Sequence, residues 1–149
     1  MGRFYLDMEW TNGNFYLGDI FEIAVISGDS GHIFHSYVKI HYKLSENIKF
    51  SCGITDDTLE NNNSFANVFI SLLNFLEKEQ AIIIAHGGYD HDFPMMLCNC
   101  MKHKCDYSTL CNYSFLDSML LLKQKGYSKL GLSSLLGKKS QEAFCSRRC

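Results

Sequence analysis

The stretch from Ser64 to Ala85 narrows the folds open to this chain more than any other. Ser64 is a good helix N-cap, and the apolar side chains that follow it have the spacing of an amphipathic helix: Phe65, Val68, Phe69, Leu72, Leu73 and Leu76. The next run, 81–85, reads Ala-Ile-Ile-Ile-Ala and predicts a strand buried on both faces. A helix leading into such a strand predicts a parallel pairing reached by a helical crossover, and hence an α/β domain.

Three further strands are predicted before that helix. Residues 4–9, 19–26 and 33–40 are rich in apolar and β-branched residues and are separated by turn residues, which predicts an antiparallel meander. The polar stretch 41–63 has no clean period, so we expect a loop with one helical turn near 55–59.

The second half of the chain continues the alternation of helices and strands. Pro94 suits the first turn of a helix, which places Asp92 at or just before that helix's N-terminus. The later elements predicted are a strand at 113–116, a helix at 118–125 and a helix at 130–136. In an open α/β sheet, the carboxyl edge of a strand such as 81–85 is where ligands bind.

Length and composition predict one compact domain over residues 1–149. A hydrophobic fraction of 46% is globular, and a net charge of −2 restricts any nucleic-acid contact to a local or metal-mediated one. No apolar run reaches the roughly 20 residues of a membrane-spanning helix, and no secretory signal is evident. We therefore expect no membrane partner and an intracellular location, in the cytoplasm or nucleus.

The chain has seven cysteines, four of which lie near His103: Cys98, Cys100, Cys105 and Cys111. In an intracellular protein such cysteines are reduced thiols in the first instance. The grouping could also bind structural zinc, although it lacks the paired spacing of ordinary zinc modules. Both interpretations stay open.

Two acids at the end of the first strand are the first candidates for chemistry. Side chains alternate along a strand, so Asp7 and Glu9 share one face while Leu6 and Met8 share the other. A divalent metal with hard oxygen ligands, Mg²⁺ or Mn²⁺, would relieve the repulsion between the two carboxylates. The alternative is that both acids are solvated at the strand end.

Other side chains have two interpretations each. Trp10 could stack on a terminal base or belong to the core. His86 and His91 could act as a base, or could be hydrogen-bonding and exposed loop residues. Asp117 is expected to accept hydrogen bonds from nearby backbone amides rather than to take part in catalysis.

Taken in order, these stretches resemble one family over residues 3 to about 137. The resemblance is to the 3′–5′ exonuclease domain of the DEDD type, histidine subgroup, as found in proofreading subunits, RNase T-like enzymes and the Trex group. The segments that carry it are 4–13, 19–25 with Glu22, 34–39, 53–55, 85–96, 115–122 and 127–137. The match places Asp92, rather than Asp90, in the second acidic motif.

The resemblance implies a ribonuclease-H-like mixed sheet with three antiparallel strands followed by parallel strands, flanked by helices. It also implies two-metal hydrolysis at single-stranded DNA or RNA 3′ ends, with Mg²⁺ or Mn²⁺ held by Asp7, Glu9 and Asp92. Trp10, His86 and His91 are the expected substrate-binding residues.

The third motif of the family departs from its pattern. In the best register, 141–146, Gln141 stands in the histidine's place and Ser146 in the aspartate's. A neutral amide is no base and a hydroxyl is a poor ligand for a hard dication, so the domain is truncated or degenerate after about residue 137. Glu142, a loop histidine or a second chain in a homodimer could supply the missing groups. Three classes stay open: an exonuclease, a pseudo-exonuclease that binds nucleic-acid ends or a protein, and a zinc-stapled interaction protein.

Overall fold

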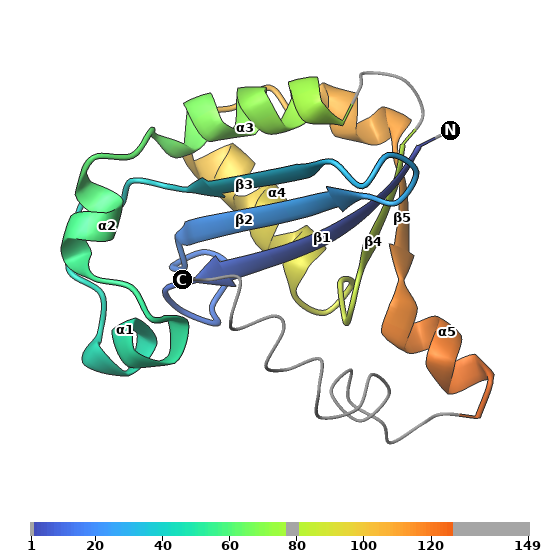
Figure 1. The fold of residues 1–149 in the computed structure, drawn as a ribbon, viewed down its shortest axis with the longest axis horizontal. Coiled ribbons are helices and arrows are strands. Elements are labelled where there is room, and N and C mark those ends of the chain that lie inside the picture. The colour runs from blue at the N-terminus through green and yellow to red at the C-terminus, as the bar shows by residue number, and fades with distance from the viewer. Residues whose placement is uncertain (1, 77–80, 127–149) are drawn as a thin grey trace.

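A five-stranded mixed sheet forms the centre of the computed structural model, which describes residues 2–76 and 81–126. The strands, in the order β3-β2-β1-β4-β5 across the sheet, are β1 (Arg3–Trp10), β2 (Ile20–Ser27), β3 (Ile33–Tyr37), β4 (Ile82–Ala85) and β5 (Ser114–Asp117). The pairs β1/β2 and β2/β3 are antiparallel, whereas β4 is parallel to both of its neighbours. The predicted mixed sheet is therefore confirmed (Figure 1).

Strand β1 shows the alternation that its sequence predicts. Phe4, Leu6 and Met8 are each at most 6% exposed and lie in the main core, while Tyr5 and Asp7 are exposed on the other face. The antiparallel register extends this core face to β2, since Leu6 pairs with Val25 and Met8 with Ile23.

Two helices supply the rest of the main core. Helix α3 (Phe65–Phe75) buries the apolar stripe that predicted it, and α4 (Asp92–Lys102) buries Met95, Met96 and Cys100. Figure 1 shows α4 crossing behind β2 and β1, with α3 running along the β3 side of the sheet. Pro94 falls in the first turn of α4, as predicted, where its missing amide hydrogen costs nothing.

The stretch 41–63 is more helical than predicted, because it contains α1 (Glu46–Cys52) as well as α2 (Asp56–Glu60). The prediction of a loop was therefore wrong for 46–52, while 41–45 are irregular as predicted. Ser45 caps the start of α1 with its side chain, and Gly53 ends it in the left-handed conformation, with φ of 66°. Both helices surround a small second core, made of Phe21, Leu44, Ile54 and Leu59.

The remaining elements follow the expected order. A short 3₁₀ helix, η1 (Ser108–Asn112), leads into β5, and α5 (Ser118–Gln124) follows it directly. The full burial predicted for β4 is wrong, because Ile82 and Ile84 are half-buried. The predicted helix at 130–136 and the third motif lie outside the described residues. No helix within 2–76 or 81–126 is long and apolar enough to span a membrane.

Candidate active site

The site lies where β1 extends past its parallel neighbour. β4 pairs with β1 only from Arg3 to Tyr5 and ends at Ala85, so the last part of β1 has no strand on that side. The start of α4 occupies this place, because the amide of Met8 donates a hydrogen bond to the carboxylate of Asp92. The crossover from β4 into α4 thus brings an acid from far along the chain to the end of β1.

Asp7 and Glu9 lie on the face of β1 opposite the main core. Asp7 is exposed and Glu9 is half-buried, and they face Ala24 and Glu22 of β2, respectively. The shared face that the two-residue period predicts is therefore present. Both residues belong to the part of β1 that is paired with β2, and this pairing fixes their backbone positions.

Asp92 is the third acid that the structure brings to this place. It is 6% exposed, and its pKa is raised to about 7. Burial is the largest cause, followed by the charge of Asp7 and, more weakly, that of Glu9, while amide hydrogen bonds from Asp92 itself and Met8 oppose the shift. Burial, together with the charges of its acidic neighbours, therefore favours the protonated form of Asp92 up to near neutral pH.

The three acids fit a hydrated divalent cation in donor type and charge. Carboxylate oxygens are the ligands that Mg²⁺ and Mn²⁺ prefer, and a dication would offset the repulsion that raises the pKa of Asp92. Across residues 2–76 and 81–126, however, no three His, Cys, Asp or Glu side chains are grouped closely enough to hold an ion.

The two loop histidines lie on either side of the β4 to α4 turn. His86 is half-buried, with Nδ1 3.1 Å from the hydroxyl of Ser118 at the start of α5. His91 is exposed at the N-cap position of α4, and its ring centroid lies 6.5 Å from that of Trp10. Trp10 itself is half-buried and packs against the main core, as the core interpretation expects.

Asp117 organises the turn that carries both histidines. Its carboxylate accepts hydrogen bonds from the amides of Gly87 at 2.9 Å, Tyr89 at 3.3 Å and Met119 at 2.8 Å. Burial alone would raise the pKa of Asp117, but these amides outweigh burial and hold the pKa below its usual value. The expectation that Asp117 bonds nearby amides is confirmed. Gly87 has φ of 74°, which favours glycine at this turn.

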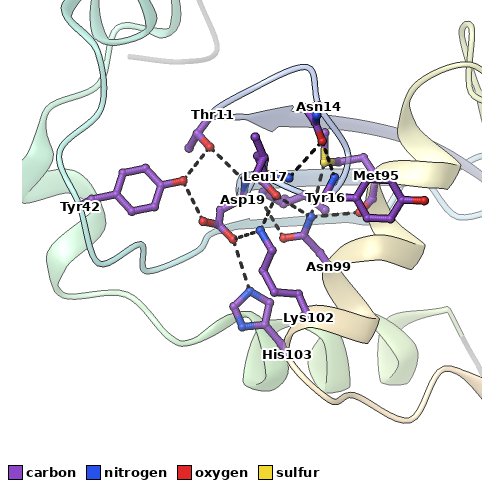
Figure 2. A network of polar contacts seen from close by, with 12 residues as sticks. Thr11, Asn14, Tyr16, Leu17, Asp19, Tyr42, Met95, Asn99, Lys102 and His103 are labelled. Atoms are coloured by element: carbon purple, nitrogen blue, oxygen red, sulfur yellow. Dashed lines mark hydrogen bonds and ion pairs between the residues drawn. The ribbon is translucent and has the colours of Figure 1, made fainter.

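A polar network holds the loop that follows Trp10 (Figure 2). Asp19 accepts hydrogen bonds from the Tyr42 hydroxyl and from Lys102 Nζ, both at 2.8 Å. The amide of Asp19 donates to the hydroxyl of Thr11 at 3.0 Å, which closes the base of the loop. Burial raises the pKa of Asp19, but the bonds from Lys102 and Tyr42 outweigh it, and the net pKa is lowered.

Asn99 fastens the same loop from within α4. Its side chain is fully buried; the amide oxygen accepts from Ile20 N–H and the amide nitrogen donates to the carbonyl of Gly18, both at 3.2 Å. Sequence reasoning missed Asp19 and Asn99. A signal existed for Asn99, because it lies on the apolar face of α4 between Met96 and Cys100, where a polar side chain needs partners.

The cysteine-rich segment is split between different surroundings. Cys100 is fully buried, and burial, aided by Cys105, raises the pKa of its thiol to about 12. His103 stacks on Phe65, with ring centroids 5.1 Å apart, and its Nε2 lies 3.6 Å from Asp19 Oδ1. In the part of the chain that the structure describes, these side chains form no group that could hold a metal.

The sequence resembles a known family and two curated proteins. The exonuclease family model RNase_T matches residues 4–141. Two curated relatives, both named DNA polymerase III PolC-type, come from Thermotoga petrophila and Thermotoga maritima, and each is 33% identical over 92 residues. Each match takes in 59% of this chain but only 7% of the polymerase, so the chain spans a small part of these relatives' length.

Solved structures with this fold include Escherichia coli exonuclease I. Its complex with a dT13 oligonucleotide has a TM-score of 0.70, with 16% identity, and the match covers 83% of this chain and 29% of the exonuclease chain. A product-bound form has a TM-score of 0.71 at the same identity, covering 82% and 31% of the two chains. These likenesses show that the chain shares the exonuclease I fold in about a third of that protein's length.

Proposed function

The chain belongs to the exonuclease family that the RNase_T model describes, and from this membership we propose that it is a metal-dependent 3′–5′ exonuclease. It would hydrolyse phosphodiester bonds at the 3′ ends of single-stranded DNA or RNA. The observation that carries the proposal is the meeting of Asp7, Glu9 and Asp92 at the free end of β1, where the pKa of Asp92 responds to the other two acids.

Asp7, Glu9 and Asp92 would hold Mg²⁺ or Mn²⁺. Bound there, the ion would polarise a phosphoryl oxygen and lower the pKa of a water molecule, which is the chemistry that two-metal nucleases use. The chain's own part is to fix these carboxylates: β2 holds Asp7 and Glu9 from one side, and α4 delivers Asp92 from the other.

The groups around the acids suit a nucleic-acid end. Trp10 directly follows Glu9 and is half-buried, so one side of its ring could stack on a terminal base. His86 and His91 lie on the turn that leads into Asp92, where either could contact the terminal phosphate or serve as base. Structures of exonuclease I with dA13 and dT13 oligonucleotides give the DNA alternative a structural precedent in the same fold.

A second candidate function is a pseudo-exonuclease that grips a nucleic-acid end or a protein without cutting. The observation that favours it is in the sequence, where Gln141 and Ser146 replace the histidine and aspartate of the third motif. Under the exonuclease proposal, Glu142, one of the loop histidines or a second chain in a homodimer supplies what these positions lack.

The test is hydrolysis of 5′-labelled single-stranded DNA and RNA with Mg²⁺ or Mn²⁺, with binding measured in parallel. For the exonuclease we expect stepwise shortening from the 3′ end that disappears in Asp7→Ala. Binding without shortening in the wild type would overturn the exonuclease proposal and support the pseudo-exonuclease.

A further inference from the structure

A fourth acid, Glu22, lies beside the three already described. In the antiparallel register of β1 and β2, Glu22 is the direct partner of Glu9, two positions from the pair formed by Asp7 and Ala24. Side chains of directly opposite residues point to the same face, with Cβ atoms about 5 Å apart. Two like charges in this arrangement repel each other unless something positive or a proton donor lies between them.

Glu22 is held firmly by its neighbours on β3. Glu22 is 6% exposed, and its Oε1 lies 2.9 Å from Nε2 of His35. The His35 ring in turn packs edge-on against Tyr37, with ring centroids 5.0 Å apart. One carboxylate oxygen is thus fixed by an imidazole that the neighbouring strand positions.

The other oxygen of the same carboxylate is in a different situation. Glu22 Oε2 is buried and accepts no hydrogen bond within the described parts of the chain. A buried carboxylate oxygen without a donor is costly, and such an atom in a native protein is commonly explained by an ordered water or a bound ion. Glu22 lies on the face of the sheet that carries Glu9 and Asp7, so a group bound by these two acids would lie beside it and could supply the donor.

The coordination habit of the ion indicates what kind of donor this is. Mg²⁺ dehydrates reluctantly and usually keeps several water molecules when one or two carboxylates bind it, so an ion bound by Asp7 and Glu9 would carry waters. Waters on a dication are strong hydrogen-bond donors, and carboxylates that accept from them hold metal ligands in place.

We propose that Glu22 is a positioning residue of the cation site: its Oε2 accepts a hydrogen bond from a water on the ion beside Glu9, while His35 holds its Oε1. The inference rests on the proposed function, since it needs a cation at Asp7 and Glu9. Glu22 touches neither substrate nor the reacting atoms, and its effect is on how tightly the ion is held.

The experiment is a Mn²⁺ titration by calorimetry and by fluorescence of Trp10, the only tryptophan, which adjoins Glu9. In Glu22→Gln the amide oxygen can still face His35, which leaves an NH₂ donor where the acceptor was needed. We expect the Mn²⁺ Kd to rise about ten-fold. Glu46→Gln is the matched control, because Glu46 is an exposed acid on α1 that pairs with Lys49, and it should leave the Kd unchanged.

A role in folding alone would not move the Mn²⁺ Kd of a folded variant, so thermal unfolding in a chelator is measured beside it. Glu22→Gln should unfold at the wild-type temperature or above. Should it fail to fold, His35→Asn, at a more exposed position, removes the hold on Oε1 and should also weaken Mn²⁺ binding, by less than ten-fold.

The Asp7→Ala variant distinguishes a failure of the metal site from a failure of the role assigned to Glu22. If the wild type binds Mn²⁺, Asp7→Ala does not, and both Glu22→Gln and His35→Asn bind as the wild type does, the inference about Glu22 is overturned and the metal site stands. If the wild type binds no Mn²⁺, the proposed metal-dependent function is overturned, and the inference with it.

Discussion

The carboxylate of Asp92 accepts a hydrogen bond from the backbone amide of Met8, and this contact joins the start of α4 to the end of β1. It exists because β4 ends at Ala85, which leaves the last part of β1 without a strand partner on that side. The acid therefore satisfies a backbone donor and, at the same time, comes into the field of Asp7 and Glu9. The same hydrogen bond thus attaches α4 to β1 and brings the three acids of the candidate site together.

The raised pKa of Asp92 predicts how stability varies with pH in the metal-free protein. Because its pKa is about 7 in the fold and 3.8 as the reference, the folded state binds more protons between these values. The free energy of unfolding should therefore fall as pH rises from about 4 to 7, by up to about 4 kcal/mol. Urea unfolding in a chelator at a series of pH values measures this.

The control for that experiment is Asp92→Asn, which removes the titrating group but keeps an oxygen acceptor for the Met8 amide. Its stability should change much less over the same pH range. A wild type and variant with the same pH dependence would show that Asp92 is not the group responsible.

A bound metal ion should raise the stability of the fold, and it should do so more at high pH than at low pH. A dication offsets the repulsion between Asp92, Asp7 and Glu9, so Mg²⁺ or Mn²⁺ should stabilise the fold most where all three are ionised. At an ion concentration ten times the Kd measured at pH 8, we expect Tm to rise by about 4 °C at pH 8 and by much less at pH 5.5, where the Kd is higher. Differential scanning fluorimetry with and without metal checks this, and an equal shift in Asp7→Ala would contradict it.

Asp19 should matter for stability, because it joins the loop after Trp10 to Tyr42 and Lys102. Asp19→Asn loses charge-assisted hydrogen bonds at a largely buried position and should lower the free energy of unfolding by about 1–3 kcal/mol at pH 7. The pKa of Asp19 is lowered in the fold, so its contribution is present above about pH 4 and is lost as pH falls through the folded pKa.

Asp29→Asn is the matched control for Asp19→Asn. Asp29 also pairs with a cation, at 2.6 Å from Arg3, but both side chains are about half exposed. Its loss should reduce stability less, since solvent screens an exposed pair. Chemical denaturation of both variants side by side gives the comparison, and equal losses would mean that the Asp19 network adds nothing to an ordinary surface pair.

Much of the fold could be predicted because period and burial agree along the chain. The alternation of Phe4 to Glu9 and the stripe that begins at Phe65 each specify one buried face, and the structure buries those faces. Helix α1 was missed because none of its residues is buried and it therefore lacks an apolar period. Its signals were only its caps, Ser45 and Gly53.

The part of the candidate site that lies on β1 could be predicted from the strand period. A strand period puts Asp7 and Glu9 on one face whatever the tertiary structure, but the partners of a site depend on register. The pairing of Glu9 with Glu22 follows from how β2 aligns with β1, which local sequence does not specify. The hold of Asp19 on Lys102 joins residues far apart in the chain and likewise needs the packed fold.

The most direct test of the account compares Asp92→Asn with Asp90→Asn in 3′-end shortening of labelled single-stranded DNA and RNA with Mg²⁺ or Mn²⁺. The two acids lie two positions apart, but Asp92 is buried against Met8 beside Asp7, whereas Asp90 is exposed in the turn. We predict that Asp92→Asn loses at least about 100-fold in rate and that Asp90→Asn shortens as the wild type does. Equal activity in the two variants, or a loss confined to Asp90→Asn, would contradict the assignment of Asp92 to the site.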